Sequence, residues 1–196
     1  MNKINTTYLV TLIVLSSLIA LKACKEKRNY IPKPPTYLRV DLPPKDYITY
    51  SDSACAISFD LPSYFNVKKV ASNTCNKDID LGPHNGSLHL SFIKMDTSLA
   101  AYIDYAIDKI DEHKVKATAI LDSTFIQDDL GTYGTLFELQ GNVASPFHFY
   151  LTDSTTIFLS GVVYFNTRPN YDSIRPVLNY VRKDLIRFME TAKWKK

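Results

Sequence analysis

The sequence predicts an α+β domain in which an antiparallel sheet packs against helices. Several short segments alternate apolar and polar residues, which is the pattern of half-buried strands. Two longer segments instead repeat apolar residues every three or four positions, as amphipathic helices do. One of these helical segments precedes four closely spaced strand segments and the other follows them. This order is typical of a sheet whose strands are neighbours in sequence and whose faces are covered by helices.

Composition agrees with one globular domain and excludes some functions. The chain has 196 residues, of which 45% are hydrophobic and 22% are charged, so it can bury a core. The net charge of +3 becomes about +1 if Lys3 and Lys22 leave with a cleaved leader. Such a balance lacks the basic footprint of a nucleic-acid-binding protein.

Residues 1–23 have the build of a lipoprotein signal peptide. Lys3 precedes an apolar run from Tyr8 to Leu21, and a run of roughly 14 residues is short for a membrane span, which needs about 20. The segment Leu21-Lys22-Ala23-Cys24 resembles a lipobox. We therefore expect Cys24 to become the first residue of the mature protein, carrying a diacylglycerol and an N-acyl chain such as palmitate. An uncleaved anchor and ordinary secretion are the alternatives.

Residues 24–45 are predicted to form a lipid-anchored, proline-rich tether. The charged stretch of residues 25–30 is followed by Pro32, Pro34 and Pro35, and a second proline pair follows at residues 43–44. Proline fixes its own φ angle and disfavours helix in the residue before it, so this segment reads as a stiff extended spacer. The predicted globular domain is residues 46–196.

The first half of this domain reads mainly as strands. Residues 55–61 alternate, with Ile57 and Phe59 on the inner face, and Pro62 ends the segment. Residues 64–70 and 87–94 are further predicted strands, the latter with His89 on its outer face. Glycine and asparagine in residues 81–86 predict the tight turn between them.

The second half reads as helix, meander and helix. The first helix runs from Leu99 to Ile110, with a cap among residues 96–98. Four strands follow, at residues 116–126, 131–141, 146–152 and 156–165, with connections that favour antiparallel neighbours. The last helix begins near Asp172, packs one apolar stripe on the sheet, and is expected to tolerate Pro176 in its first turn.

This order of elements resembles the α/β/α sandwich of domains related to the Mog1 and PsbP proteins. Their opening strand also ends in a Leu-Pro-like break and precedes a helix, a meander and a second helix. The resemblance concerns the fold. Because members of that group bind partners, it also implies an interaction role.

A closer resemblance, to the gliding motility lipoprotein GldD family, covers the chain from about residue 32 to its end. The similar segments are the proline arm at 32–43, CAISF at 55–59, LHLSF at 88–92, FHFYLTDST at 147–155, YF at 164–165, RPNYDSI at 168–174 and KWK at 193–195. The resemblance implies a non-catalytic structural or assembly component of the envelope machinery for gliding motility and type IX secretion. Its implied partners are other envelope proteins of that machinery and the membrane, with no nucleic acid.

A second function remains open on the sequence alone: a periplasmic carrier or enzyme that acts on a lipid, glycan or peptide. A deep apolar pocket with convergent polar groups would favour this alternative, and a filled interface between sheet and helix would favour the assembly component. Either protein is expected in the cell envelope, membrane-anchored and facing the periplasm.

The cysteines agree with that compartment. Lipidation of Cys24 leaves Cys55 and Cys75 as a pair in a space that permits disulfides. We predict a bridge between them, which would close a loop of about 20 residues. Two separate buried thiols and a metal or redox pair are the alternatives.

No metal site is predicted. His84 and His89 lie near Asp78 and Asp80 in the sequence, but they lack the paired spacing that zinc sites show. His84 is interpreted as a turn residue and His89 as an outward strand residue.

No catalytic residue and no cofactor beyond the acyl chains is predicted either. His148, Asp153 and Ser154 are hydrolase residue types, but G-x-S-x-G is missing, and a strand with its adjoining turn is a poor frame for a triad. Residues 153–155 are interpreted as a hairpin turn. Asp104, Asp108 and Asp111 form one solvated helix stripe.

A partner-binding patch is predicted from outward side chains near the end of the chain. It comprises His148, Tyr150 and Tyr164 on strands and Arg182 and Arg187 on the basic face of the last helix. The alternative is that the helices simply cover the outward aromatic residues.

Overall fold

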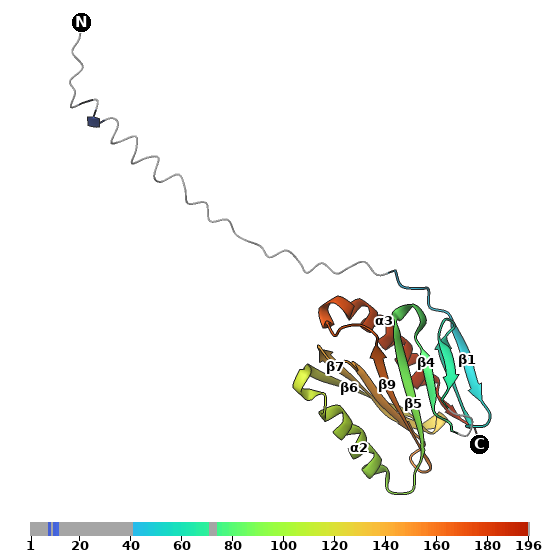
Figure 1. The fold of residues 1–196 in the computed structure, drawn as a ribbon. Coiled ribbons are helices and arrows are strands. Elements are labelled where there is room, and N and C mark those ends of the chain that lie inside the picture. The colour runs from blue at the N-terminus through green and yellow to red at the C-terminus, as the bar shows by residue number, and fades with distance from the viewer. Residues whose placement is uncertain (1–7, 9, 12–40, 71–73, 196) are drawn as a thin grey trace. The chain divides into compact units, whose positions relative to one another are not determined.

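The computed structural model describes residues 8, 10–11, 41–70 and 74–195, and the fold lies in the part from residue 41 onward (Figure 1). That part contains two antiparallel sheets and two α-helices. The predicted α+β class with an antiparallel sheet is therefore confirmed. Cys24, the predicted signal peptide and most of the predicted tether lie outside the described residues, and their assignments stay predictions.

The larger sheet has seven antiparallel strands in the order β3-β4-β5-β9-β8-β7-β6. The predicted meander is confirmed and consists of β6 (Ala117–Gln127), β7 (Thr132–Gly141), β8 (Phe147–Thr152) and β9 (Ile157–Phe165). Strand β5 (Gly86–Lys94) pairs with β9 along its whole length. Beyond β5, the short strands β4 (Lys77–Asp80) and β3 (Asn66–Lys69) complete the sheet.

The smaller sheet has β2 (Ile57–Pro62) between β1 (Tyr47–Asp52) and β10 (Lys193–Trp194). The predicted strand starts two residues too early, because Cys55 lies in the turn that joins β1 to β2. Ala56 in that turn has a φ of 49°, which ends the extended conformation there. The two ends of the domain therefore meet across β2.

Helix α3 (Tyr171–Thr191) packs between the smaller sheet and one face of the larger one, where the main core lies. The Phe188 ring is 4.3 Å from that of Phe59 in β2 and 5.4 Å from that of Phe149 in β8, measured between centroids. Asn170 caps the helix, its side chain accepting the N–H of Ser173. Pro176 consequently falls in the second helical turn, so its predicted first-turn position is wrong; the buried stripe of residues 178–189 holds the helix beyond it.

Helix α2 (Leu99–Asp111) lies on the opposite face of the larger sheet. Of its residues, Ile110 alone is buried, in a small cluster with Leu139 and Val143. Ser98 caps it, as expected for one of residues 96–98, through a hydrogen bond from the N–H of Ala101. Three 3-10 turns complete the described structure: η1 (Gly82–His84), η2 (Lys114–Lys116) and η3 (Asp128–Leu130). The weak burial of α2 leaves the sheet beneath it incompletely covered.

The chain enters the domain along α3. The buried carboxylate of Asp184 accepts a hydrogen bond from the Tyr47 hydroxyl at 2.7 Å and pairs with Lys45. The Tyr180 hydroxyl donates to the carbonyl of Pro43. Residues 43–47 are therefore bound to the helix, although the sequence predicts that the tether extends to residue 45.

The β8–β9 hairpin closes on one carboxylate, as its predicted turn at residues 153–155 suggested. Asp153 accepts the backbone N–H groups of Thr155 at 3.0 Å, Thr156 at 2.7 Å and Ile157 at 2.9 Å. Partial burial would raise its pKa, but these bonds and the Thr156 hydroxyl outweigh it and lower the pKa to about 2. Ser154 follows with a φ of 70°.

This hairpin should give the domain a defined acid sensitivity. Because the folded-state pKa of Asp153 lies below the unfolded value of about 3.9, its contribution is complete above about pH 4 and is lost as pH falls toward 2. Asp153→Asn keeps an oxygen acceptor and removes the charge. We expect the difference in urea midpoint between wild type and Asp153→Asn to shrink from pH 5 to pH 2. A difference that stays constant over this range would contradict the assignment.

Candidate functional site

A cavity of about 330 Å³ lies between α2 and the sheet face beneath it, and we call it the α2 hollow. Strands β5, β8 and β9 form its floor, β7 contributes one residue, and α2 with the turn after it forms its roof. Its lining residues are Ser91, Ile93, Tyr105, Ala106, Lys109, Ile110, Glu112, His113, Phe137, His148, Phe149, Tyr150, Phe158, Ser160, Val162 and Tyr164. The size falls at the lower end of the range for small-molecule sites.

The floor of the α2 hollow is aromatic. The Tyr150 and Phe158 rings stack with centroids 5.2 Å apart and planes inclined by 17°. Tyr102 extends this stack from α2, its ring 5.6 Å from that of Phe158. The Tyr150 hydroxyl accepts a hydrogen bond from the Thr135 hydroxyl at 3.1 Å, which fixes the ring from behind. The stack therefore forms an apolar floor whose position is set by its neighbours.

The inner end of the α2 hollow is polar. His148 Nε2 lies 2.9 Å from Ser145 Oγ, and that oxygen lies 3.4 Å from His113 Nε2. The rings of His113 and His148 are 5.4 Å apart. Burial, and then the neighbouring His113, lower the pKa of His148 to about 4, so this imidazole is neutral at physiological pH. A neutral imidazole and a hydroxyl can both donate and accept hydrogen bonds.

The mouth of the α2 hollow carries amphipathic side chains. Tyr105 is 58% exposed on α2 and Tyr164 is 38% exposed on β9. Among the described lining residues, the one fixed positive charge is Lys109, and its ammonium lies 2.8 Å from the carboxylate of Glu112. The hollow thus combines an apolar floor, a neutral polar end and a mouth with balanced charge.

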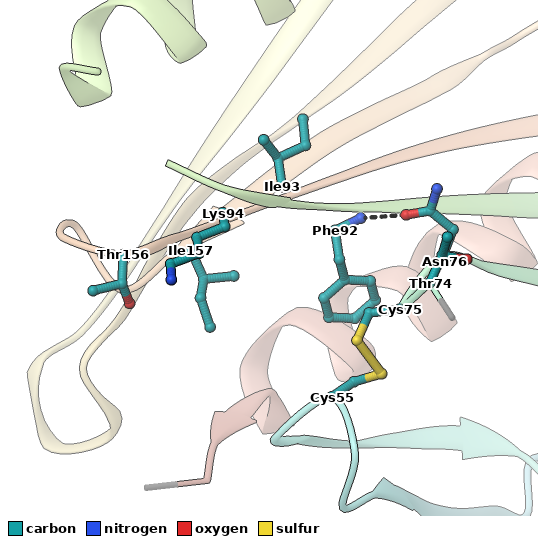
Figure 2. A pocket seen from close by; sticks show the side chains of 9 residues that line it. All are labelled: Cys55, Thr74, Cys75, Asn76, Phe92, Ile93, Lys94, Thr156 and Ile157. Atoms are coloured by element: carbon teal, nitrogen blue, oxygen red, sulfur yellow. Dashed lines mark hydrogen bonds between the residues drawn. A yellow bond between two sulfur atoms is a disulfide. The ribbon is translucent and has the colours of Figure 1, made fainter. Parts of the chain in front are cut away.

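A second, more open groove of about 540 Å³ lies beside the disulfide, at the end of the sheet where Lys94 of β5 pairs with Ile157 of β9 (Figure 2). Cys55 and Cys75 are joined there, with Cα atoms 5.5 Å apart. Asn76 accepts the backbone N–H of Phe92 at 2.9 Å and so ties the second cysteine loop to β5. The bridge supports the predicted pairing of these cysteines.

A buried ion pair lies beside the disulfide and binds the backbone next to it. Lys77 Nζ lies 3.1 Å from Asp52 Oδ2 and donates to the carbonyl of Cys75 at 3.0 Å. The other oxygen of Asp52 accepts the N–H groups of Ala54 and Cys55, which closes the turn between β1 and β2. Burial alone would raise the pKa of Asp52, but the ammonium and these N–H groups hold it below its usual value. The pair is a structural clamp on the bridged loops.

The structure brings together three of the five residues of the predicted patch. His148, Tyr150 and Tyr164 all line the α2 hollow, but His148 is buried, so its predicted exposure is wrong. Arg182 and Arg187 lie on α3, on the other side of the sheet, where Arg182 Nε is 2.9 Å from Glu138 and Arg187 is 2.7 Å from Asp60. The arginines therefore cannot share one surface with the other three.

The residues weighed as metal ligands remain in separate contacts. His89 Nδ1 lies 2.6 Å from Asp78, both half-exposed, whereas His84 is buried against Tyr64 with its Nε2 3.3 Å from the hydroxyl. Within the described residues, no group of three or more potential ligands converges.

Sequence reasoning missed the polar end of the hollow. Ser145 and His113 lie in connections before β8 and after α2, where no strand or helix period indicates direction. Phe158 could have been predicted as a site residue, because its strand alternates cleanly and places it on the same face as Tyr164.

One protein-family model matches most of the chain. The model of the family described as "Gliding motility lipoprotein GldD" matches residues 27–194. No curated protein matches the chain. Neither helix of the described part is both long and apolar enough to cross a membrane.

Two solved structures are similar in outline. The Ran-binding protein Mog1p of Saccharomyces cerevisiae shares 10% identity and a TM-score of 0.48, covering 77% of this chain and 96% of its own. PsbP of the cyanobacterium Synechocystis sp. PCC 6803 shares 12% identity and a TM-score of 0.43, covering 75% and 95%.

Proposed function

The chain belongs to the gliding motility lipoprotein GldD family, and on that premise we propose that it is a non-catalytic assembly component that holds a segment of another envelope protein in the α2 hollow. Membership makes it a lipoprotein of the gliding machinery, associated with the cell envelope. Family membership supports the assembly role, and the α2 hollow supplies a candidate contact for a partner, because its aromatic floor and neutral polar end face a helix that covers them incompletely.

The chemistry of the hollow favours a peptide segment as its occupant. The aromatic floor suits an apolar side chain, and the imidazole of His148, which lines the hollow, can bond to a backbone amide. An anionic headgroup or an anionic glycan would need a positive charge, but His148 is neutral and Lys109 is already paired with Glu112. The half-exposed Tyr105 and Tyr164 at the mouth suit the rim of such a contact.

The anchor and the link to secretion belong to the same proposal. Lipidation at Cys24 would hold the domain at the membrane on its periplasmic side, within reach of other machinery proteins. Their assembly would then support both gliding and type IX secretion. The lipobox-like segment before Cys24 and the family membership support this placement.

The test uses a deletion strain complemented with variants of the full chain. Ala106→Phe places a ring into the α2 hollow from the roof, whereas Ala101→Phe makes the same change on the exposed side of α2. We expect Ala106→Phe and Cys24→Ser to abolish colony spreading and secretion of type IX cargo, and Ala101→Phe to preserve both. Immunoblots must show normal amounts of the Ala106→Phe and Ala101→Phe proteins. Normal spreading and secretion with Ala106→Phe would contradict the role of the hollow.

The volume of the α2 hollow favours a second candidate, a carrier of a small apolar molecule. The two candidates differ in what the hollow contains in the cell. A photo-crosslinking residue at position 105 should give a protein adduct if the occupant is a partner segment. A carrier should give no such adduct and should instead release a stoichiometric small molecule on solvent extraction, which Ala106→Phe would displace.

A further inference from the structure

We propose that the free edge of β6 is a homodimer interface, at which two copies of this chain pair their β6 strands antiparallel across a two-fold axis at Ser123. Among the described strands, β6 pairs with β7 alone, so its outer backbone N–H and C=O groups face away from the sheet. An extended backbone edge of this kind is a template for another strand. This interface is separate from the α2 hollow.

The two edges of the larger sheet differ in how they are protected. At the far edge, β3 is four residues long and carries Lys68. Short length and an edge lysine are two common features that prevent a further strand from pairing. Strand β6 is eleven residues long and carries a single charge, Asp122. Two of its large apolar side chains are exposed, Leu121 by 50% and Ile126 by 70%. The long edge is therefore adapted to being covered.

The geometry of β6 sets the position of the two-fold axis. A bulge between Ala117 and Ala119 interrupts the strand at one end, and η3 terminates it after Gln127 at the other. A two-fold axis perpendicular to a continuous sheet leaves each side chain on the face that it occupies, and residues directly opposite each other in an antiparallel pair share a face. The axis must therefore lie between the two copies of a single residue. The midpoint of the regular stretch from Ala119 to Gln127 is Ser123.

Side-chain chemistry selects the same register. With Ser123 on the axis, Leu121 lies opposite Phe125 of the second copy and Ile120 lies opposite Ile126, which are favourable cross-strand pairs. An axis at Asp122 would place two carboxylates opposite each other, and one at Leu121 would place Asp122 opposite Ile120. Asp122 lies opposite Thr124 when the axis is at Ser123. One register therefore satisfies both the geometry and the pairing.

The charges beyond the strand are complementary in this arrangement. Lys116 precedes β6 in η2, beside Lys114, which pairs with Asp111 of its own chain, and Asp128 and Asp129 follow β6 in η3. An antiparallel pair brings the basic end of one copy beside the acidic end of the other. These opposite charges favour a second copy of the chain over a strand of unmatched sequence.

Cysteine cross-linking in membranes from cells that produce the full chain tests the interface. Ser123→Cys should give a covalent dimer after mild oxidation, with a yield about tenfold that of Ile126→Cys, because two Cβ atoms must lie within about 4 Å to form a disulfide. Ile126 is the stringent control, since it is more exposed but lies far from its own copy in this register. Adding Leu121→Lys to Ser123→Cys should remove most of the dimer.

Non-reducing gels report the dimer, and the monomer amounts confirm that each variant accumulates. A strong Ser123→Cys dimer with little from Ile126→Cys supports the proposal, as does its loss with Leu121→Lys. Monomer alone for Ser123→Cys at normal accumulation would overturn it. Equal yields at both positions would also overturn it, since they indicate random collision.

Discussion

Phe188→Ala is expected to lower the free energy of unfolding by about 3–5 kcal/mol, the range for removing a buried phenylalanine. The Phe188 side chain is fully buried and contacts Phe59 in the smaller sheet and Phe149 in the larger one. Its removal would leave a cavity where both sheets and α3 meet. The surroundings cannot close it without moving one sheet toward the other, so we expect the high end of the range.

Urea denaturation of the full chain, followed by near-UV circular dichroism, measures this loss. Tyr105→Ala is the matched control, because it also removes an aromatic ring but from an exposed position on α2. Its expected cost is within about 0.5 kcal/mol. Similar losses for the two variants would show that the junction at Phe188 is not the centre of the core.

Asp52→Asn is expected to cost about 3–5 kcal/mol as well, because it leaves the ammonium of Lys77 buried without its counter-charge. The asparagine oxygen can still accept the N–H groups of Ala54 and Cys55, so the change isolates the charge from the turn. Lys77→Met should be costly for the reciprocal reason. The double variant should cost much less than the sum of the two single changes.

A double-mutant cycle under non-reducing conditions measures this coupling. The comparison pair is Lys109 and Glu112, which makes a similar contact at the surface and should couple far more weakly, because solvent screens the two charges. Additive single effects at Asp52 and Lys77 would show that each residue acts alone and that the pair is no clamp.

The sequence predicted the parts of the fold whose patterns are local. Alternation identified β5 to β9, and the helical period identified α2 and α3, because each of these elements is long and buries one face. Strands β1 and β10 were missed because their pairing with β2 joins residues far apart in the chain, and β10 has two residues. Strand β4 was missed for its length of four residues.

The candidate site was predicted in part for a similar reason. Strand alternation placed His148, Tyr150 and Tyr164 on one face, and all three line the α2 hollow. The helical period showed that Arg182 and Arg187 lie away from the apolar stripe of α3, but it could not show which face of the sheet α3 covers. Their separation from the other three residues follows from that choice of face.

The attachment of residues 43–47 to α3 has a mechanical consequence. Tension applied through the chain before Asp41 reaches the Tyr180–Pro43 and Lys45–Asp184 contacts before it reaches the first rung of β1, at Tyr47. The load therefore passes into a 21-residue helix that is packed along the core, and the β1–β2 ladder is shielded from being unzipped rung by rung. A domain built this way resists tension at its N-terminal end, which is where the proposed lipid anchor would apply it.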